Sequence, residues 1–183
     1  MDSRVERNKL KRKKIKRKRL KRLFSIIALV FFVGVTIVFI TDKFFFSVFT
    51  VDGESMQRTL YEGDKIIIQK INIKAEDLKQ DDIVSFIGND ERLYIKRIIG
   101  IPGDVIEIVN GKVLVNGVQK IETYIKGNIT ESYSQSKWFV KENEFFVLGD
   151  NRLKNKSKDS RIFGTINIEQ IEGKVVYNFN TER

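Results

Sequence analysis

Apolar positions divide the chain into one long uninterrupted segment and a series of short runs. Residues 23–40 carry no charged side chain. As a helix rising ~1.5 Å per residue they would span about 27 Å, close to the hydrocarbon thickness of a bilayer. The apolar part of a cleaved signal peptide is shorter, and no small-x-small site follows the segment here. We therefore predict a transmembrane anchor over residues 23–42, with residues 44–46, three phenylalanines, at the membrane interface.

The chain from residue 43 to 183 has the pattern of a single β-rich domain. Its apolar runs are short, rich in Ile and Val, and bounded by Gly, Asp and Asn, which is typical of strands. The pair Asn110 and Gly111 between two such runs predicts a two-residue hairpin turn. Residues 75–79 are expected to form one helical turn, and the polar residues 119–143 an irregular loop or a small excursion. The predicted strands are residues 65–71, 82–87, 93–101, 105–109, 112–115, 145–148, 165–168 and 174–179.

Positive charge is concentrated ahead of the apolar segment. Residues 1–22 hold 13 of the 34 Lys and Arg and 2 of the 24 Asp and Glu, so the remainder has 21 basic and 22 acidic residues. The positive-inside rule then predicts a cytoplasmic tail over residues 1–22, in contact with anionic lipid, and an extracytoplasmic domain in the cell membrane. A nucleic-acid-binding function is disfavoured, because the part expected to fold has a net charge of −1.

The composition excludes several kinds of catalysis. The chain has no histidine and no cysteine, which rules out a Ser-His-Asp triad, thiol catalysis, disulfides and Cys/His zinc sites. No sequence resembles a calcium-binding loop. We expect neither a metal nor a cofactor.

A serine and a lysine together can still cleave an amide bond. Serine needs a base to take its proton, and lysine can serve when burial lowers its pKa enough to leave it neutral. Lys96 lies in an apolar run in which alternation puts it and Arg97 on opposite faces, so that one of the two should point inward. The alternation does not decide which one. Taken singly, Lys96 is more simply a solvated strand lysine and Ser55 a loop serine.

A polar stretch over residues 149–161 follows the run 145–148. Its simplest interpretation is a turn held by an Asp–Arg pair. A hydroxyl in this stretch would alternatively orient Lys96, because nucleophile–base pairs generally need a third group.

Four motifs in order resemble the bacterial type I signal peptidases, membrane-bound Ser–Lys proteases that remove signal peptides from exported proteins. They are residues 51–60 around Ser55, Gly63 and Asp64 with the strand that follows, residues 94–104 around Lys96, and residues 149–161. The single N-terminal anchor is similar to that of Gram-positive members.

This resemblance implies a β-sheet domain and a role for each matching residue. Ser55 would attack the carbonyl after a small residue, and Lys96 would be the general base. Ser157 would orient Lys96, and Asp159 with Arg161 would form a structural ion pair.

Further roles concern the oxyanion and the substrate. The backbone N–H of Ser55 would help form the oxyanion hole, together with position 53, where many relatives have a hydroxyl and this chain has Gly53. Exported preproteins would bind as an added strand, and the protein would act as a monomer. The residues expected to bind the substrate are Asp52, Gly53, Leu93, Tyr94 and Ile95.

The chain departs from the family pattern at two places. Arg58 stands where relatives have proline, and residues 153–156 lengthen the last motif. We hypothesise a specialised peptidase with a narrow substrate range. The alternative is a catalytically impaired assembly factor or substrate-binding module at the membrane. A self-cleaving repressor, which also uses a Ser–Lys dyad, would need a DNA-binding module where the anchor lies.

Overall fold

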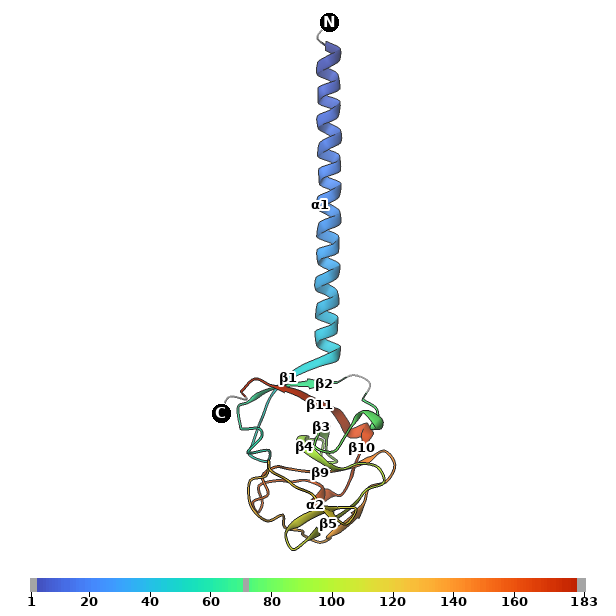
Figure 1. The fold of residues 1–183 in the computed structure, drawn as a ribbon. Helices are drawn as coiled ribbons and strands as arrows, with labels where there is room; N and C mark the ends of the chain where they lie inside the picture. The colour runs from blue at the N-terminus through green and yellow to red at the C-terminus, as the bar shows by residue number, and fades with distance from the viewer. Residues whose placement is uncertain (1–2, 71–72, 181–183) are drawn as a thin grey trace. The chain divides into compact units, whose positions relative to one another are not determined.

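The structure is a computed structural model that describes residues 3–70 and 73–180 (Figure 1). Its contacts divide the chain into two units, Met1–Lys43 and Phe44–Arg183. Each unit is described by itself.

The first unit is described by helix α1, Ser3–Phe45, whose last two residues belong to the second unit. The helix includes the predicted anchor and continues back through the basic tail, since Lys and Arg are good helix formers. Among the described residues, Lys16–Val38 is the one segment long and apolar enough to cross a membrane. Its large side chains are exposed, for example 76% for Phe24 and 73% for Phe31. No protein surface covers this apolar stretch within the unit.

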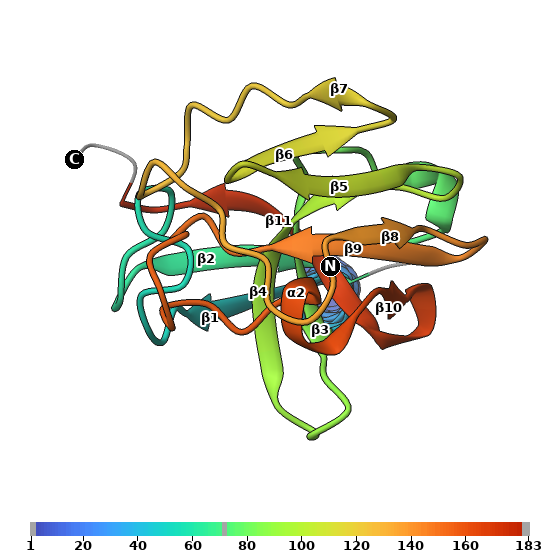
Figure 2. The same cartoon turned by 90° about the horizontal axis from the view of Figure 1, so that it is seen from below.

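The second unit is built from two antiparallel sheets (Figures 1 and 2). The larger sheet has the order β1-β2-β11-β3-β4-β9-β10, and the smaller has the order β7-β6-β5-β8. The strands of the larger sheet are β1 (Phe46–Thr50), β2 (Lys65–Gln69), β3 (Ile83–Ile87), β4 (Leu93–Gly100), β9 (Glu144–Leu148), β10 (Ile166–Asn167) and β11 (Ile171–Asn178). Those of the smaller are β5 (Val105–Val109), β6 (Lys112–Val115), β7 (Val118–Gln119) and β8 (Lys137–Phe139).

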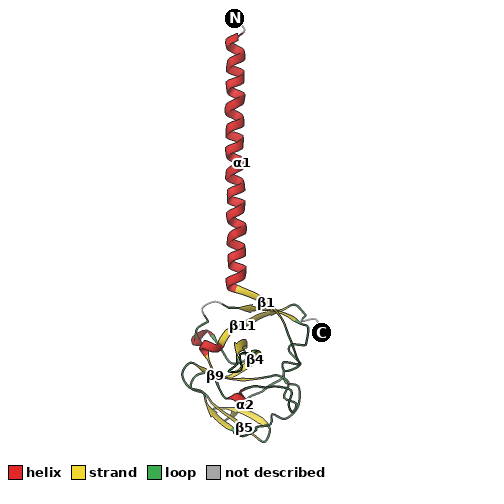
Figure 3. Ribbon diagram, turned by 180° about the vertical axis from the view of Figure 1, so that it is seen from behind, coloured by secondary structure: helices red, strands yellow, loops and turns green. Residues whose placement is uncertain are grey.

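Helices contribute little to this unit (Figure 3). The described ones are η1 (Ala75–Asp77), α2 (Ser160–Phe163) and η2 (Ile168–Gln170). The prediction of a mainly β domain with one N-terminal apolar helix is therefore confirmed.

Apolar side chains fasten the two sheets together. Ile99 of β4 and Phe146 of β9 pack in one cluster with Ile106 of β5 and Trp138 of β8. The rings of Trp138 and Phe146 lie 4.8 Å apart between centroids. Because β4 and β9 are neighbours in the larger sheet, this cluster holds the C-terminal end of β4 in a fixed position.

Two short strands, β1 and β8, were not among the predicted strands. Residues 119–143, expected to be an irregular loop or a small excursion, contain β8, whose Trp138 is buried. Phe46, expected at a membrane interface, begins strand β1 and pairs with Gln69. Both strands are short, and their pairing depends on distant partners that local sequence does not reveal. Residue 71, the end of one predicted strand, lies outside the described residues.

Candidate active site

The loop between β1 and β2 presents Ser55 at the surface of the β-rich unit. Met56 and Leu60 are buried on either side of an otherwise polar stretch and anchor the loop in an apolar cluster with Ile66 and Ile68. Ser55 itself is partly exposed. The loop is therefore fixed by its apolar residues while the hydroxyl remains accessible.

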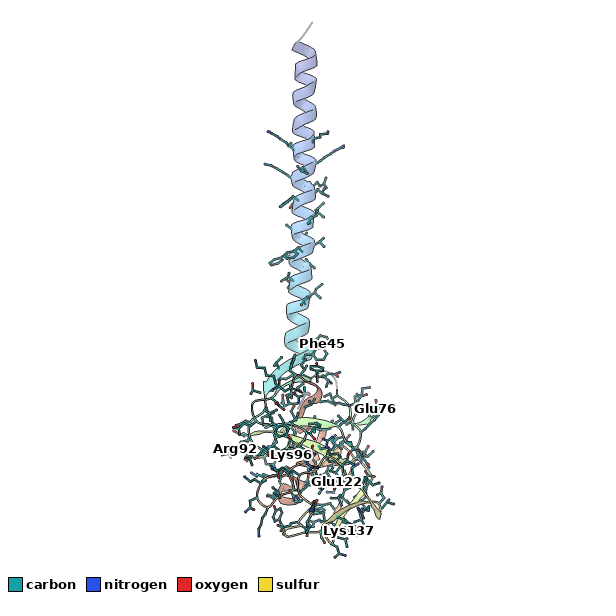
Figure 4. The ribbon with its side chains drawn as sticks, turned by 60° about the vertical axis from the view of Figure 1, so that its left-hand side comes forward. Phe45, Glu76, Arg92, Lys96, Glu122 and Lys137 are labelled. Atoms are coloured by element: carbon teal, nitrogen blue, oxygen red, sulfur yellow. The ribbon has the colours of Figure 1, made fainter. Side chains whose placement is uncertain are left out.

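Lys96 reaches this hydroxyl from strand β4. Its Nζ lies 2.8 Å from Ser55 Oγ and donates a second hydrogen bond, also 2.8 Å, to the carbonyl oxygen of Ile95. The side chain is only 2% exposed, and Figure 4 labels it within the β-rich unit. The two residues singled out in the sequence, forty-one positions apart, thus meet at hydrogen-bonding distance.

Burial changes the acidity of the Lys96 ammonium. Desolvation disfavours the charged form and lowers the pKa of Lys96 to about 8, although the carboxylates of Asp159 and Asp150 oppose the change. At pH 8 about half of the molecules then carry a neutral amine that can accept a proton.

Lys96 and Arg97 are both buried, contrary to the prediction that only one of them would face inward. They do lie on opposite faces of β4, but each face is covered. Arg97 is compensated by Asp150, to which its Nε and Nη2 donate hydrogen bonds of 2.9 and 2.6 Å. Its guanidinium also lies 4.0 Å from the centroid of the Tyr124 ring. A buried arginine needs such partners, and the sequence did not reveal them.

The ion pair expected in the last motif is present. Arg161 donates to both carboxylate oxygens of Asp159, each at 2.8 Å, and both side chains are buried. Asp159 also accepts hydrogen bonds from the backbone N–H of Gly149 and from the Ser157 hydroxyl, the latter at 2.7 Å. The carboxylate therefore ties the end of β9 to the start of α2.

The structure places Ser157 beside the nucleophile loop. Gly149 separates the two, and a Cβ added at Gly149 would overlap Ser157 Oγ and lie 2.6 Å from the carbonyl oxygen of Ser55. The Ser157 hydroxyl donates a hydrogen bond to Asp159. The role of Ser157 in orienting Lys96 stays a prediction.

The lengthened segment after Arg152 forms a turn. The N–H of Lys156 donates to the carbonyl of Leu153, and Asn155 adopts a positive φ of 59°. Ser157 remains 4% exposed. The tip of the turn comes back to the nucleophile loop, where Lys156 Nζ lies 2.9 Å from a carboxylate oxygen of Glu54.

A cavity of about 430 Å³ opens beside Ser55 and Lys96. One wall is the segment that follows β1, and the other is the start of β4. The cavity includes all five residues predicted to bind the substrate, and its lining consists of Phe49, Thr50, Val51, Asp52, Gly53, Glu54, Ser55, Met56, Leu93, Tyr94, Ile95, Lys96, Lys156 and Lys158.

Gly53 borders open space. Its φ is +86°, and no heavy atom lies within 4 Å of the position that a Cβ would take. Backbone of this kind favours glycine. An oxyanion at this site would meet the N–H of Ser55 without a neighbouring hydroxyl from position 53.

Asn151 is a functional residue that the sequence did not single out. Its N–H donates to the carbonyl of Ser55 at 2.9 Å, and its side-chain amide donates to the carbonyl of Glu54 at 3.0 Å. These two hydrogen bonds hold the peptide groups on both sides of Ser55. In the sequence, the only indication of this role was the position of Asn151 directly after Gly149 and Asp150.

Acidic side chains do not gather into a metal site. Among the described residues, no group of three or more Asp and Glu is arranged to hold a metal ion.

Comparisons with known proteins identify the family of the chain. The family described as "Signal peptidase, peptidase S26" matches residues 23–179. Signal peptidase IB of Staphylococcus aureus is 36% identical over 163 residues, which cover 80% of this chain and 84% of the relative. Signal peptidase I of Bacillus caldolyticus is 37% identical over 160 residues, which cover 81% and 87%.

A solved structure is also similar. The crystal structure of a signal peptidase I from Enterococcus faecalis V583 is 30% identical, with a TM-score of 0.47, over 57% of this chain and all of the other. The family match over most of the sequence confirms the resemblance to bacterial type I signal peptidases. The chain belongs to the signal peptidase family, peptidase S26.

Proposed function

We propose that the protein is a membrane-anchored serine endopeptidase that removes N-terminal signal peptides from exported preproteins after small-x-small sites. The observation that carries the proposal is the 2.8 Å separation of Lys96 Nζ and Ser55 Oγ at the edge of a cavity. Membership of a peptidase family supports it. No metal or cofactor takes part in the mechanism.

Acylation begins with the neutral amine of Lys96. It accepts the proton of the Ser55 hydroxyl, and Oγ bonds to the carbonyl carbon of the scissile amide. The N–H of Ser55 donates to the developing oxyanion, a contact that can contribute ~3 kcal/mol in such sites. The C–N bond then breaks, and the Lys96 ammonium gives its proton to the leaving amine of the mature protein.

Deacylation uses the same two groups in reverse. Lys96, neutral again, takes a proton from water, and the hydroxide bonds to the ester carbon. The C–O bond to Ser55 breaks, and Lys96 returns the proton to Oγ. Asp159 and Arg161 stabilise the turn that keeps Ser157 beside the dyad, where Ser157 orients Lys96.

The signal peptide lies as an extended strand in the cavity. Its backbone pairs with Asp52 and Gly53 on one wall and with residues 93–95 on the other. The small residues before the scissile bond point into shallow apolar pockets. The protein acts as a monomer on this substrate.

The apolar helix is the anchor of the enzyme. With residues 1–22 cytoplasmic, the catalytic domain lies outside the cell membrane, where cleavage sites emerge. Protease treatment of intact cells tests this orientation: the catalytic domain should be digested and the basic tail protected, and the reverse pattern would contradict it.

Arg58 and the turn over residues 153–156 restrict the enzyme to few preproteins. The direct test uses the full chain reconstituted in lipid with preproteins from its own host, and mass spectrometry of the products. Cleavage after small-x-small sites by the native protein should be lost in Ser55→Ala and Lys96→Ala. The exposed Lys154→Ala serves as the matched control and should retain activity.

Two other results would change the interpretation. Efficient cleavage of a broad set of unrelated preproteins would contradict the narrow range. No cleavage of any preprotein by the folded native protein would refute the peptidase and favour the assembly factor.

A further inference from the structure

Lys158 lines the catalytic cavity although it belongs to neither of the two walls expected to hold substrate. It comes from the last motif, between Ser157 and Asp159, which are both buried. The backbone on either side of Lys158 is therefore fixed, and its side chain is the part that projects toward the cavity.

The end of this side chain is held by the turn that leads into β4. Lys158 Nζ donates to Asp90 Oδ2 at 2.8 Å and lies 5.7 Å from the centroid of the Tyr94 ring. Lys96 Nζ lies 5.6 Å from the centroid of the same ring. The side chain of Lys158 thus borders the aromatic surface next to the proposed base.

Tyr94 is itself a rigid surface. Its ring stacks on Phe86 with centroids 5.6 Å apart and packs against Phe163 at 6.1 Å. Its hydroxyl donates to Asp90 Oδ2 at 2.8 Å, the same oxygen that accepts from Lys158. These contacts hold the pKa of Asp90 down to about 2, with the Lys158 hydrogen bond as the largest cause, so Asp90 is ionised throughout the physiological range.

An isolated ion pair at a surface is weak, but this one is part of a three-group network. The four methylenes of a lysine commonly pack along an apolar surface while the ammonium stays near water. Here the ammonium is fixed by Asp90 and 47% of the Lys158 side chain is exposed. The rest of the Lys158 side chain is covered, and it lines the cavity together with Tyr94.

We propose that Lys158 is a specificity-determining residue. Its stem, held beside Tyr94 by Asp90, limits the pocket next to Ser55 to small substrate side chains. This inference rests on the proposed peptidase function of the same cavity, and it assigns part of the small-residue requirement to a side chain outside the two walls.

The test compares kcat/KM for peptides that carry alanine or leucine at the residue before the scissile bond, and at the third residue before it. The full-length native protein in lipid should prefer alanine at both. Lys158→Ala should reduce this preference at one of the positions by roughly tenfold or more, the usual effect of a few methylenes in an apolar pocket. Lys158→Met keeps an unbranched stem but loses the hydrogen bond to Asp90, so its preference should lie between those of the native protein and Lys158→Ala.

Two further variants make the result specific. Lys141→Ala removes an exposed lysine outside both the cavity and the turn over residues 153–156, and it should leave the preference unchanged. Asp90→Asn releases the ammonium without shortening the stem, so it should weaken the preference in the same direction as Lys158→Ala. It also provides the test if the alanine variant fails to fold, which the fluorescence of the buried Trp138 would show.

The outcomes separate the two claims. An unchanged alanine preference at both positions, in Lys158→Ala or in its substitute Asp90→Asn, would overturn the inference while leaving the peptidase intact. Failure of the native protein to cleave the alanine peptides would overturn the proposed function and this inference together.

Discussion

Lys96→Met should make the protein more stable at neutral pH, because the native side chain is an ammonium buried away from water. Its pKa is lowered from 10.5 to about 8, chiefly by desolvation. The unfolded chain therefore holds the proton more strongly than the folded protein does. At pH 7 this difference lowers the free energy of unfolding of the native protein. Methionine has a similar length and no charge, so it would remove this loss.

The sign and size of the effect follow from linkage. A lysine with a lowered pKa destabilises the folded state fully below pH 8, less between pH 8 and 10.5, and not above that range. At roughly 1.4 kcal/mol per pKa unit the full cost is about 3 kcal/mol. The stability of Lys96→Met relative to the native protein should therefore fall by about 2 to 3 kcal/mol between pH 7 and pH 10.

Denaturant unfolding of the full chain in detergent, followed by the fluorescence of Trp138, measures this quantity. Methionine also loses the hydrogen bonds to Ser55 and to the carbonyl of Ile95, a cost largely shared by all pH values. The change with pH is thus the tested quantity. Lys154→Met, at an exposed position, should follow the native protein at every pH. A Lys96→Met difference that stays constant from pH 7 to 10 would refute the reasoning.

Three further results are expected. Asp159→Ala leaves a buried Arg161 unpaired and should lower the free energy of unfolding by ~3–5 kcal/mol in thermal or denaturant unfolding. Lys156→Ala breaks an exposed pair and should lower it by less than ~1 kcal/mol. Equal effects would contradict the stabilising role of the buried pair. Gly149→Ala forces Ser157 away from the nucleophile loop and should lower kcat about 100-fold while the protein stays folded, so native kcat would count against this packing. Deleting residues 1–43 should raise KM for preproteins in vesicles and spare kcat on short peptides, and an unchanged KM would exclude a role of the anchor in presenting substrate.

Local patterns predicted the strands that are long or bounded by strong turns. β5 and β6 joined at Asn110 and Gly111 follow from a two-residue turn, and β4 follows from a long Ile-rich run. β8 has only three residues and sits in a polar stretch, so its strand conformation depends on pairing with β5 and on the burial of Trp138. Such pairing is set by the tertiary fold and leaves little trace in local sequence.

The same distinction holds for the site. Four site residues stand in recognisable motifs, and the resemblance to a family gave each an expected role: Ser55, Lys96, Asp159 and Arg161. The hydrogen bonds from Asn151 to the nucleophile loop join residues almost a hundred positions apart and appear only in the fold. The alternation of side chains along β4 correctly placed Lys96 and Arg97 on opposite faces of the strand. It could not show that both faces are covered.

The pH dependence of kcat/KM tests the central claim, that the neutral amine of Lys96 activates Ser55, most directly. The measurement uses the full-length protein in lipid and a peptide with a small-x-small site. The account predicts a rate that rises about tenfold from pH 6 to pH 7 and reaches half its maximum near pH 8, because only the neutral base is active. A rate that is independent of pH between 6 and 9, or that is half-maximal only above pH 10, would contradict it.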